Sequence, residues 1–107
     1  MPRIKFQTLT EQMYYILLCL NRECYGMDIM DKVPAMTHGR VKVGPGTLYN
    51  LLEQFLAAEI ISETKAEGRR RSYILTEKGR ALLDNEFRRL NSLIEDYQYY
   101  LVKEEAK

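Results

Sequence analysis

The sequence predicts a mainly α-helical domain that carries a small β-hairpin and is followed by a long C-terminal helix. Three features indicate this arrangement. A Gly-Pro-Gly break at residues 44–46 comes directly before an amphipathic helical pattern. Two runs flank a basic tetrapeptide at residues 68–71, as in a hairpin, and they contain the strand-favouring residues Ile and Thr in the first run and Tyr and Ile in the second. Residues 83–101 place apolar side chains at alternating intervals of four and three, which is the spacing of a coiled-coil seam.

The composition is that of a soluble globular protein of one domain, with 107 residues, 46% hydrophobic and 29% charged. The net charge of +1 says little, but eight Lys/Arg and five Glu lie between His38 and Arg80, an excess of three. Most of this excess lies at residues 69–71, and such clustering is typical of phosphate-binding surfaces. We interpret Cys19 and Cys24 as small core residues of a cytoplasmic protein. The sequence has no apolar run of about 18 residues that would span a membrane.

The N-terminal half is expected to contain two helices and a short strand. Residues 1–8 are predicted to form a flexible tail. Thr8 and Glu11 match a capping box, which places the start of the first helix near Leu9. A second helix is expected over residues 27–36, and the alternation of polar and apolar residues predicts a short strand at 40–43.

The C-terminal half is expected to contain the third helix, the hairpin and the last helix. The third helix covers residues 47–58, strands follow at 60–67 and 72–75, and Thr76 caps the last helix. The buried stripe of the third helix is Leu48, Leu51, Leu52, Phe55 and Leu56. This order is that of a winged helix-turn-helix with an extra helix. It predicts a DNA-binding domain over residues 1–78 and a C-terminal dimerisation helix over 79–107.

A winged helix-turn-helix places the start of its recognition helix against base edges in the major groove of double-stranded DNA. Asn50 is suited to pair with adenine, and the Thr47 methyl group is suited to contact thymine. Gly46 leaves the backbone open to phosphate, and the three arginines of the hairpin suit a wing that contacts phosphates or the minor groove. The predicted DNA-binding set is Arg40, Lys42, Gly46, Thr47, Tyr49, Asn50, Arg69, Arg70, Arg71 and Tyr73.

The seam of the last helix is predicted to need a partner, because an isolated helix of under three heptads is marginal in water. The partner is either the first helix of the same chain or a second copy of the chain. We favour a homodimer because three helices already fill the core of the small domain. The tyrosines near the end of the helix suit interface packing or a ligand pocket. The predicted interface consists of Leu83, Phe87, Leu90, Ile94, Tyr97 and Leu101.

Three stretches in register resemble the PadR-like family of transcriptional regulators. They are Tyr25-Gly26-Met27-Asp28-Ile29, Val43-Gly44-Pro45-Gly46-Thr47-Leu48-Tyr49 and Arg69-Arg70-Arg71-Ser72-Tyr73-Ile74-Leu75-Thr76-Glu77-Lys78-Gly79. The resemblance implies a dimeric winged-helix regulator, mostly a repressor, that dimerises through its last helix. It also implies a small aromatic or hydrophobic effector near the dimer interface. The chain departs from the family pattern at three positions. They are Asn50, where Pro is usual, Glu59, where Gly usually ends the recognition helix, and Met27, where an aromatic residue is frequent.

Two other classes of function fit the sequence less well. An enzyme is disfavoured because the sequence offers no plausible Ser/His/Asp set and no Cys/His metal spacing, and His38 is its single histidine. We therefore expect no metal and no cofactor, and we expect His38 to lie in an exposed loop. The alternative to a DNA-binding regulator is a winged-helix protein-interaction module that does not bind DNA. The basic hairpin favours DNA, because a protein-binding module does not need three adjacent arginines there.

Overall fold

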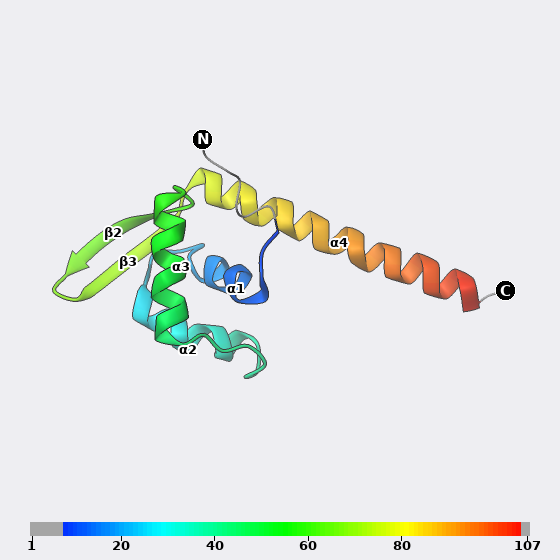
Figure 1. Ribbon diagram of the computed structural model, residues 1–107, viewed down its shortest axis with the longest axis horizontal. Helices are drawn as coiled ribbons and strands as arrows, with labels where there is room; N and C mark the ends of the chain where they lie inside the picture. The colour runs from blue at the N-terminus through cyan, green and yellow to red at the C-terminus, as the bar shows by residue number, and fades with distance from the viewer. Residues whose placement is uncertain (1–7, 106–107) are drawn as a thin grey trace.

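Three short helices, a small antiparallel sheet and one long helix make up the computed structural model, which describes residues 8–105 (Figure 1). The predicted N-terminal tail lies outside the described residues apart from Thr8. In chain order the elements are α1 (Glu11–Cys19), β1 (Cys24–Tyr25), α2 (Gly26–Met36), α3 (Pro45–Ala57), β2 (Ile61–Glu67), β3 (Arg70–Leu75) and α4 (Glu77–Glu105). This is the predicted winged helix-turn-helix with an added helix.

The first helix begins at Glu11, later than the start near Leu9 that the sequence pattern predicts. Thr10, not Thr8, is the N-cap, and its side chain accepts a hydrogen bond from the backbone N–H of Met13 at 3.2 Å. The capping box of Thr8 and Glu11 is therefore wrong, because Glu11 is the first residue of the helix rather than its third. The N-cap predicted at Thr76 is confirmed, since its hydroxyl accepts from the N–H of Gly79 at 3.0 Å.

The strand predicted at residues 40–43 is a loop. Val41 and Val43 are buried, so the alternation correctly marks one apolar face. No neighbouring strand among the described residues pairs with this loop, and side chains satisfy part of its backbone instead. The Thr37 hydroxyl accepts from the N–H of Val41 at 3.1 Å, and the Gln12 amide donates to the carbonyl of Lys42 at 2.8 Å. The alternation of polar and apolar residues therefore indicates here which side chains are buried. It does not produce a strand, because no neighbouring strand within residues 8–105 forms hydrogen bonds with this loop.

The sheet has the order β1-β3-β2 and is antiparallel throughout. β2 and β3 form the predicted hairpin, whose turn is Gly68 and Arg69 rather than residues 68–71. β1 was not predicted, because a strand of two residues carries no periodic pattern and exists only through its pairing with β3. The hairpin projects from the body of the molecule as the wing (Figure 1).

Helix α3 ends in a Schellman motif that brings the chain into β2. The N–H of Glu59 donates to the carbonyl of Leu56, and the N–H of Ile60 donates to that of Phe55. Glu59 has φ of 62°, a left-handed conformation that favours glycine. A glycine would adopt this conformation without strain, whereas Glu59 adopts it at a conformational cost.

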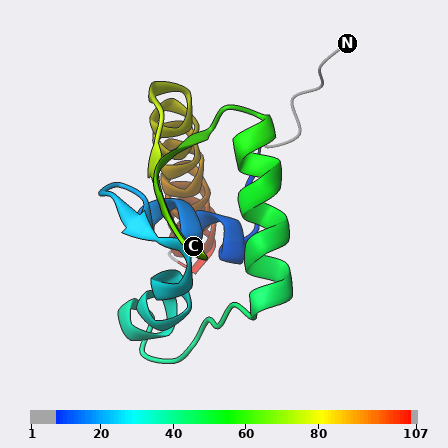
Figure 2. The ribbon, with the colours of Figure 1, turned by 90° about the vertical axis from the view of Figure 1, so that its left-hand side faces the viewer.

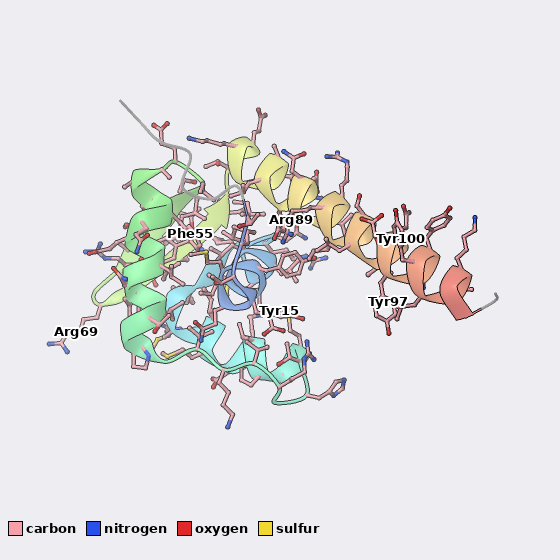
Figure 3. All side chains as sticks on the ribbon, turned by 45° about the vertical axis from the view of Figure 1, so that its right-hand side comes forward. Tyr15, Phe55, Arg69, Arg89, Tyr97 and Tyr100 are labelled. Atoms are coloured by element: carbon pink, nitrogen blue, oxygen red, sulfur yellow. The ribbon has the colours of Figure 1, made fainter. Side chains whose placement is uncertain are left out.

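A single apolar cluster joins the helices and the sheet. Its buried members are Ile16, Leu17, Leu20, Cys24, Ile29, Val33, Val41, Val43, Leu48, Leu51, Leu52, Phe55, Ile60, Ile61, Tyr73 and Leu83. Four of the five residues predicted for the buried stripe of α3 are in this set, and Leu56 is partly buried against it. Phe55 points from α3 into this core (Figure 3). The core therefore holds α3 by one face and leaves the other face to solvent.

Helix α4 begins on the core and then leaves it. A Cβ at Gly79 would overlap the carbonyl oxygen of Ile60, so the helix start packs directly against backbone. α4 also packs on α1, but every side chain from residue 91 to 103 is exposed, and the chain reaches 63 Å along its longest axis. Figure 2 looks from the wing side, with α4 running away behind the core. Within residues 8–105, no helix has the length and apolarity to cross a bilayer.

Candidate nucleic-acid interface

The exposed side of α3 carries the residues predicted to face DNA. Pro45 opens the helix at its first turn, and Leu48, Leu51 and Leu52 anchor the opposite side in the core. Gly46, Thr47, Tyr49 and Asn50 are all exposed. A Cβ added at Gly44 or Gly46 would meet nothing within 4 Å, so the backbone at the helix start is open to solvent. Free N–H groups and the helix dipole make such an N-terminus suited to a phosphate.

The loop before α3 brings two further predicted cations to this helix start. Arg40 and Lys42 are both exposed. The Arg40 guanidinium donates to the Tyr15 hydroxyl at 2.9 Å and to the carbonyl of Thr37 at 3.4 Å. Together with the bond from Gln12 to Lys42, this contact ties the loop to α1. Sequence reasoning missed Gln12 and Tyr15, because their partners are distant in the chain.

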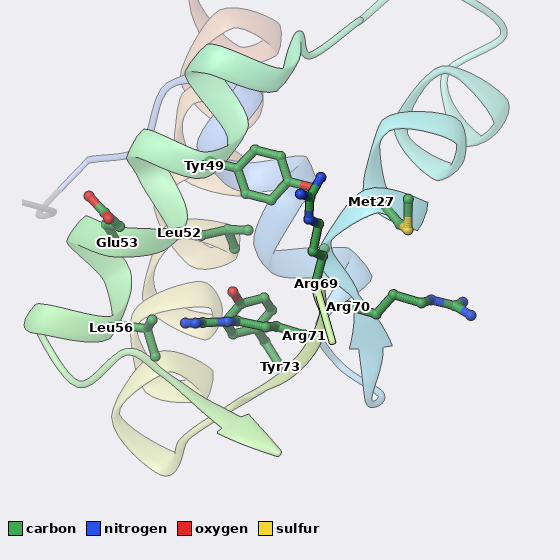
Figure 4. A pocket seen from close by; sticks show the side chains of 10 residues that line it. Met27, Tyr49, Leu52, Glu53, Leu56, Arg69, Arg70, Arg71 and Tyr73 are labelled. Carbon is green, nitrogen blue, oxygen red and sulfur yellow. The ribbon is translucent and has the colours of Figure 1, made fainter. Parts of the chain in front are cut away.

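The three arginines of the hairpin do not all lie at its tip. Arg69 belongs to the turn, after Gly68 with φ of 62°, whereas Arg70 and Arg71 are the first residues of β3. Successive strand residues point to opposite faces. Arg71 points toward α3 and forms a 3.6 Å ion pair with Glu63, while Arg70 points away and lies over the ring of Tyr25 at 4.2 Å (Figure 4).

A groove of about 490 Å³ separates α3 from the wing (Figure 4). Its lining combines apolar side chains of Met27, Leu52 and Leu56 with the hairpin arginines. Tyr73, which the sequence predicted to contact DNA, also lines the groove. It is only 5% exposed, so most of its side chain belongs to the core, whereas Tyr49 is exposed. Burial, with the nearby Glu63, raises the pKa of Tyr73, which keeps its hydroxyl protonated at neutral pH.

One acidic residue on this surface was not in the predicted set. Glu53 is exposed, lies one helical turn beyond Tyr49 and Asn50, and lines the same groove as the arginines. The helical pattern of the sequence already places Glu53 on the unburied side of this helix, since residues three and four apart share a helix face. A carboxylate facing DNA repels phosphates but can accept a hydrogen bond from the amino group of cytosine.

The predicted seam of α4 divides into a buried start and an exposed remainder. Leu83 is 7% exposed and belongs to the chain's own core. Leu90 is partly buried, whereas Phe87, Ile94 and Tyr97 are more than half exposed and Leu101 is exposed at 43%. Tyr97 and Tyr100 project from the far part of α4, away from the body (Figure 3). The far part of α4 extends away from α3 and the wing (Figure 1).

His38 and the two cysteines lie outside the DNA-facing surface proposed from the sequence. His38 is exposed in the loop after α2, as expected, and adopts a left-handed φ of 53°. Cys24 is buried and Cys19 is partly buried, and both are free thiols. Burial is the main cause that raises the pKa of Cys19 to about 11, and it also raises that of Cys24. Both thiols are therefore protonated at neutral pH and poorly nucleophilic.

Comparison with known proteins gives a consistent result. The model of the transcriptional regulator PadR-like family matches residues 16–85, well over half of the chain. A PadR-like transcription factor from Bacteroides fragilis is 29% identical, with a TM-score of 0.68 over 81% of this chain and 86% of that one. Among curated proteins, none matches the chain.

Two more distant structures share the fold. RosR of H. salinarum is 22% identical, with a TM-score of 0.65 over 92% of this chain and 94% of that one. The PcaV transcriptional regulator of Streptomyces coelicolor, solved in complex with its natural ligand, is 16% identical. Its TM-score is 0.68 over 94% of this chain and 69% of that one.

Proposed function

Because the chain belongs to the PadR-like family of transcriptional regulators, we propose that it binds double-stranded DNA sequence-specifically, as a homodimer, and represses transcription. One observation carries the proposal. The exposed start of α3, with Thr47, Tyr49 and Asn50, lies beside a wing that presents Arg69 and Arg71. This combination supplies base-reading groups and phosphate-binding cations on one surface.

In this mode of binding, α3 enters the major groove with its first two turns. Asn50 donates to and accepts from an adenine edge, and the methyl group of Thr47 contacts thymine. The open backbone at Gly46 approaches a phosphate. Arg40 and Lys42 flank the helix on the phosphate backbone, and Arg69 at the wing tip reaches the adjacent phosphates or minor groove.

The homodimer is supported by the row of apolar side chains that α4 leaves exposed. Phe87, Ile94, Tyr97 and Leu101 continue the seam beyond the point where the chain's own core ends. Such a contiguous apolar surface is typical of an interaction site. A second copy that covers this row would place two recognition helices about a two-fold axis, which suits an inverted-repeat operator.

The resemblance to the family supports repression that is released by a small aromatic or hydrophobic effector. A hollow of about 300 Å³ lies between α1 and α4, at the start of the exposed seam, and its lining includes Tyr14, Leu18 and Phe87. The remaining lining adds apolar Leu83 and the polar side chains of Asn21, Arg80 and Asp84, and apolar walls with a few polar groups suit such a molecule. An effector held there would act on the relative position of α1 and α4, and α1 in turn holds the loop that bears Arg40.

The test is selection of bound duplexes from a random-sequence DNA library, followed by sequencing, at about 50 mM and 200 mM salt. We expect a palindrome whose half-sites lie about one helical turn apart. Asn50→Ala should relax the selected base at one position of each half-site, and Asn91→Ala, an exposed residue of α4, serves as the matched control. Absence of any bound fraction at low salt would reject DNA binding and favour the protein-interaction alternative.

A further inference from the structure

We propose that Tyr25 is a positioning residue that fixes the wing, and with it the Arg69 guanidinium, in the orientation that DNA binding requires. The inference rests on the DNA-binding function proposed above. It extends that function to a residue outside both the recognition helix and the hairpin.

The outer part of the wing lacks the support of a third strand. β1 pairs with β3 only at Tyr73 and Ser72, so Arg70 and Arg71 are paired with β2 alone. A two-stranded ribbon is marginally stable in water. The register of β2 is also shifted between Glu63 and Lys65, and such a bulge bends and twists a strand. The orientation of the wing tip is therefore not determined by backbone pairing to the body.

Tyr25 reaches across this unsupported part of the hairpin. Its ring lies under the Arg70 guanidinium, with 4.2 Å from the guanidinium carbon to the ring centroid. Its hydroxyl donates to the Glu67 carboxylate at 3.3 Å. Glu67 and Arg70 are directly paired and are the last pair before the turn. One side chain of the body thus contacts both strands of the wing at their outermost rung.

The three arginines of the wing differ in their contacts with the rest of the protein. Arg70 is held on the Tyr25 ring, on the face of β3 away from α3 (Figure 4). Arg71 is ion-paired with Glu63 at 3.6 Å. Among the residues that the structure describes, Arg69 has no ion-pair partner within 4 Å. Arg69 is therefore the wing cation that loses least when it binds a phosphate, and a fixed wing lowers the entropy cost of that contact.

Tyr25 is also the residue that links the wing to the helix-turn-helix. It is the N-cap of α2 and the last residue of β1. A second link, the ion pair of Lys65 with Glu23, is 3.9 Å long between side chains that are 57% and 41% exposed, so its contribution is small. The aromatic contact of Tyr25 with Arg70 is the main tether, because the 3.3 Å hydrogen bond to Glu67 and the 3.9 Å ion pair both lie at the long end of their distance ranges.

The first experiment needs no DNA. The full chain and its Tyr25→Leu and Tyr25→Phe variants are digested briefly with trypsin, and the cleavage rate after Arg69, Arg70 and Arg71 is followed by mass spectrometry. Cleavage requires local opening of the hairpin. We expect Tyr25→Leu to raise the cleavage rate of the wing about fivefold or more. Tyr25→Phe, which keeps the ring under Arg70, should change it less than about twofold. Cleavage after Lys103 in α4 is the internal control.

The second experiment measures the dissociation constant for the selected duplex and its dependence on salt. Arg69→Ala should weaken binding and reduce the salt slope by about one, as expected for loss of one phosphate contact. Tyr25→Leu should likewise weaken binding and reduce the salt slope, with an unchanged melting temperature. Tyr25→Phe should bind the duplex as the wild type does. Combined with Arg69→Ala, Tyr25→Leu should add less than about a twofold further loss, because both changes remove the same contact.

Equal wing cleavage in the wild type and Tyr25→Leu would overturn the proposal, whatever the DNA result. Full additivity of Tyr25→Leu with Arg69→Ala would overturn it as well, since the two residues would then act independently. A wild-type chain that binds no DNA contradicts the proposed function instead, and the trypsin comparison still decides whether Tyr25 holds the wing.

Discussion

The Glu86 carboxylate accepts a hydrogen bond from the backbone N–H of Leu9, 77 residues earlier in the chain, at 3.0 Å. The Arg89 guanidinium donates to both oxygens of the same carboxylate, at 2.7 and 2.9 Å. Glu86 is only 2% exposed, so a charged residue at the buried start of α4 secures the segment that leads into α1. It lies three residues after Leu83, on the face that the seam marks as apolar.

This arrangement predicts a pH-dependent stability. The hydrogen bond from Arg89 is the main cause that lowers the pKa of Glu86, with a further contribution from Leu9 and against the effect of burial. A carboxyl group whose pKa is lowered on folding stabilises the fold above its unfolded pKa of about 4.3, and this stabilisation is lost as the pH falls through the folded value. Glu86→Gln should lower the free energy of unfolding at pH 7 by about 1–3 kcal/mol.

The measurement is thermal unfolding followed by circular dichroism between neutral and acidic pH. The wild type and Glu86→Gln should differ at pH 7 and converge as Glu86 becomes protonated. Glu95→Gln, at an exposed position of the same helix, is the control and should behave like the wild type. A constant difference between wild type and Glu86→Gln down to the lowest pH would contradict the assignment.

Gly79→Ala should destabilise the fold. The added Cβ would overlap the carbonyl oxygen of Ile60, and a backbone atom cannot move aside as a flexible side chain can. We expect a loss of about 1–3 kcal/mol in the free energy of unfolding, measured by urea denaturation. Gly46→Ala is the matched control, because a Cβ there meets nothing within 4 Å and alanine favours a helix. Equal destabilisation by both changes would show that lost flexibility, not the contact, is responsible.

The same Gly46→Ala variant tests the approach of DNA to the start of α3. Its fold should be intact, while the methyl group intrudes on the backbone surface proposed to bind a phosphate. We expect about a tenfold weaker affinity for the selected duplex, equivalent to about 1.4 kcal/mol, by fluorescence anisotropy. Unchanged affinity would place the phosphate elsewhere.

Glu59→Gly should stabilise the protein. Glu59 has φ of 62°, where a side chain is strained, and the Schellman motif fixes this conformation through backbone bonds alone. The expected gain in the free energy of unfolding is roughly 0.5–1 kcal/mol, after the entropy of glycine in the unfolded chain is allowed for. Ala57→Gly, two residues earlier at the end of the helix, should instead cost up to about 1 kcal/mol. Urea denaturation of both variants gives the two changes in the free energy of unfolding. A loss of stability in Glu59→Gly would show that the backbone of Glu59 is not strained.

Two substitutions in the seam of α4 should separate dimerisation from folding. Ile94 is 53% exposed, so Ile94→Asp should leave the monomer folded and remove the proposed dimer. Leu83 is 7% exposed and belongs to the core, so Leu83→Asp should unfold the domain itself. Light scattering gives the mass and circular dichroism the fold. If Ile94→Asp kept the mass of a dimer, the interface would have to lie outside the predicted seam.

Local patterns in the sequence were sufficient for much of the fold and of the candidate surface. The order of helices and hairpin, the cap at Thr76 and four of the five buried positions of α3 follow from apolar spacing and turn residues alone. Thr47, Tyr49 and Asn50 could be placed on an exposed face because a helix that buries every third or fourth residue leaves the others to solvent. These features depend on interactions between residues close in the chain.

The sequence by itself therefore determined the order of the four helices and the hairpin, the solvent-facing side of α3 and the apolar row of α4. Only the tertiary structure decided which residues that are far apart in the sequence contact one another. β1 is a strand because β3 lies beside it, and the loop at 40–43 is not one because Thr37 and Gln12 satisfy part of its backbone. The different contacts of the three wing arginines also depend on partners that are not their neighbours in the chain. The same is true of the burial of Glu86. Such pairings carry no periodicity, since the folded chain, not the spacing of its residues, brings the groups together.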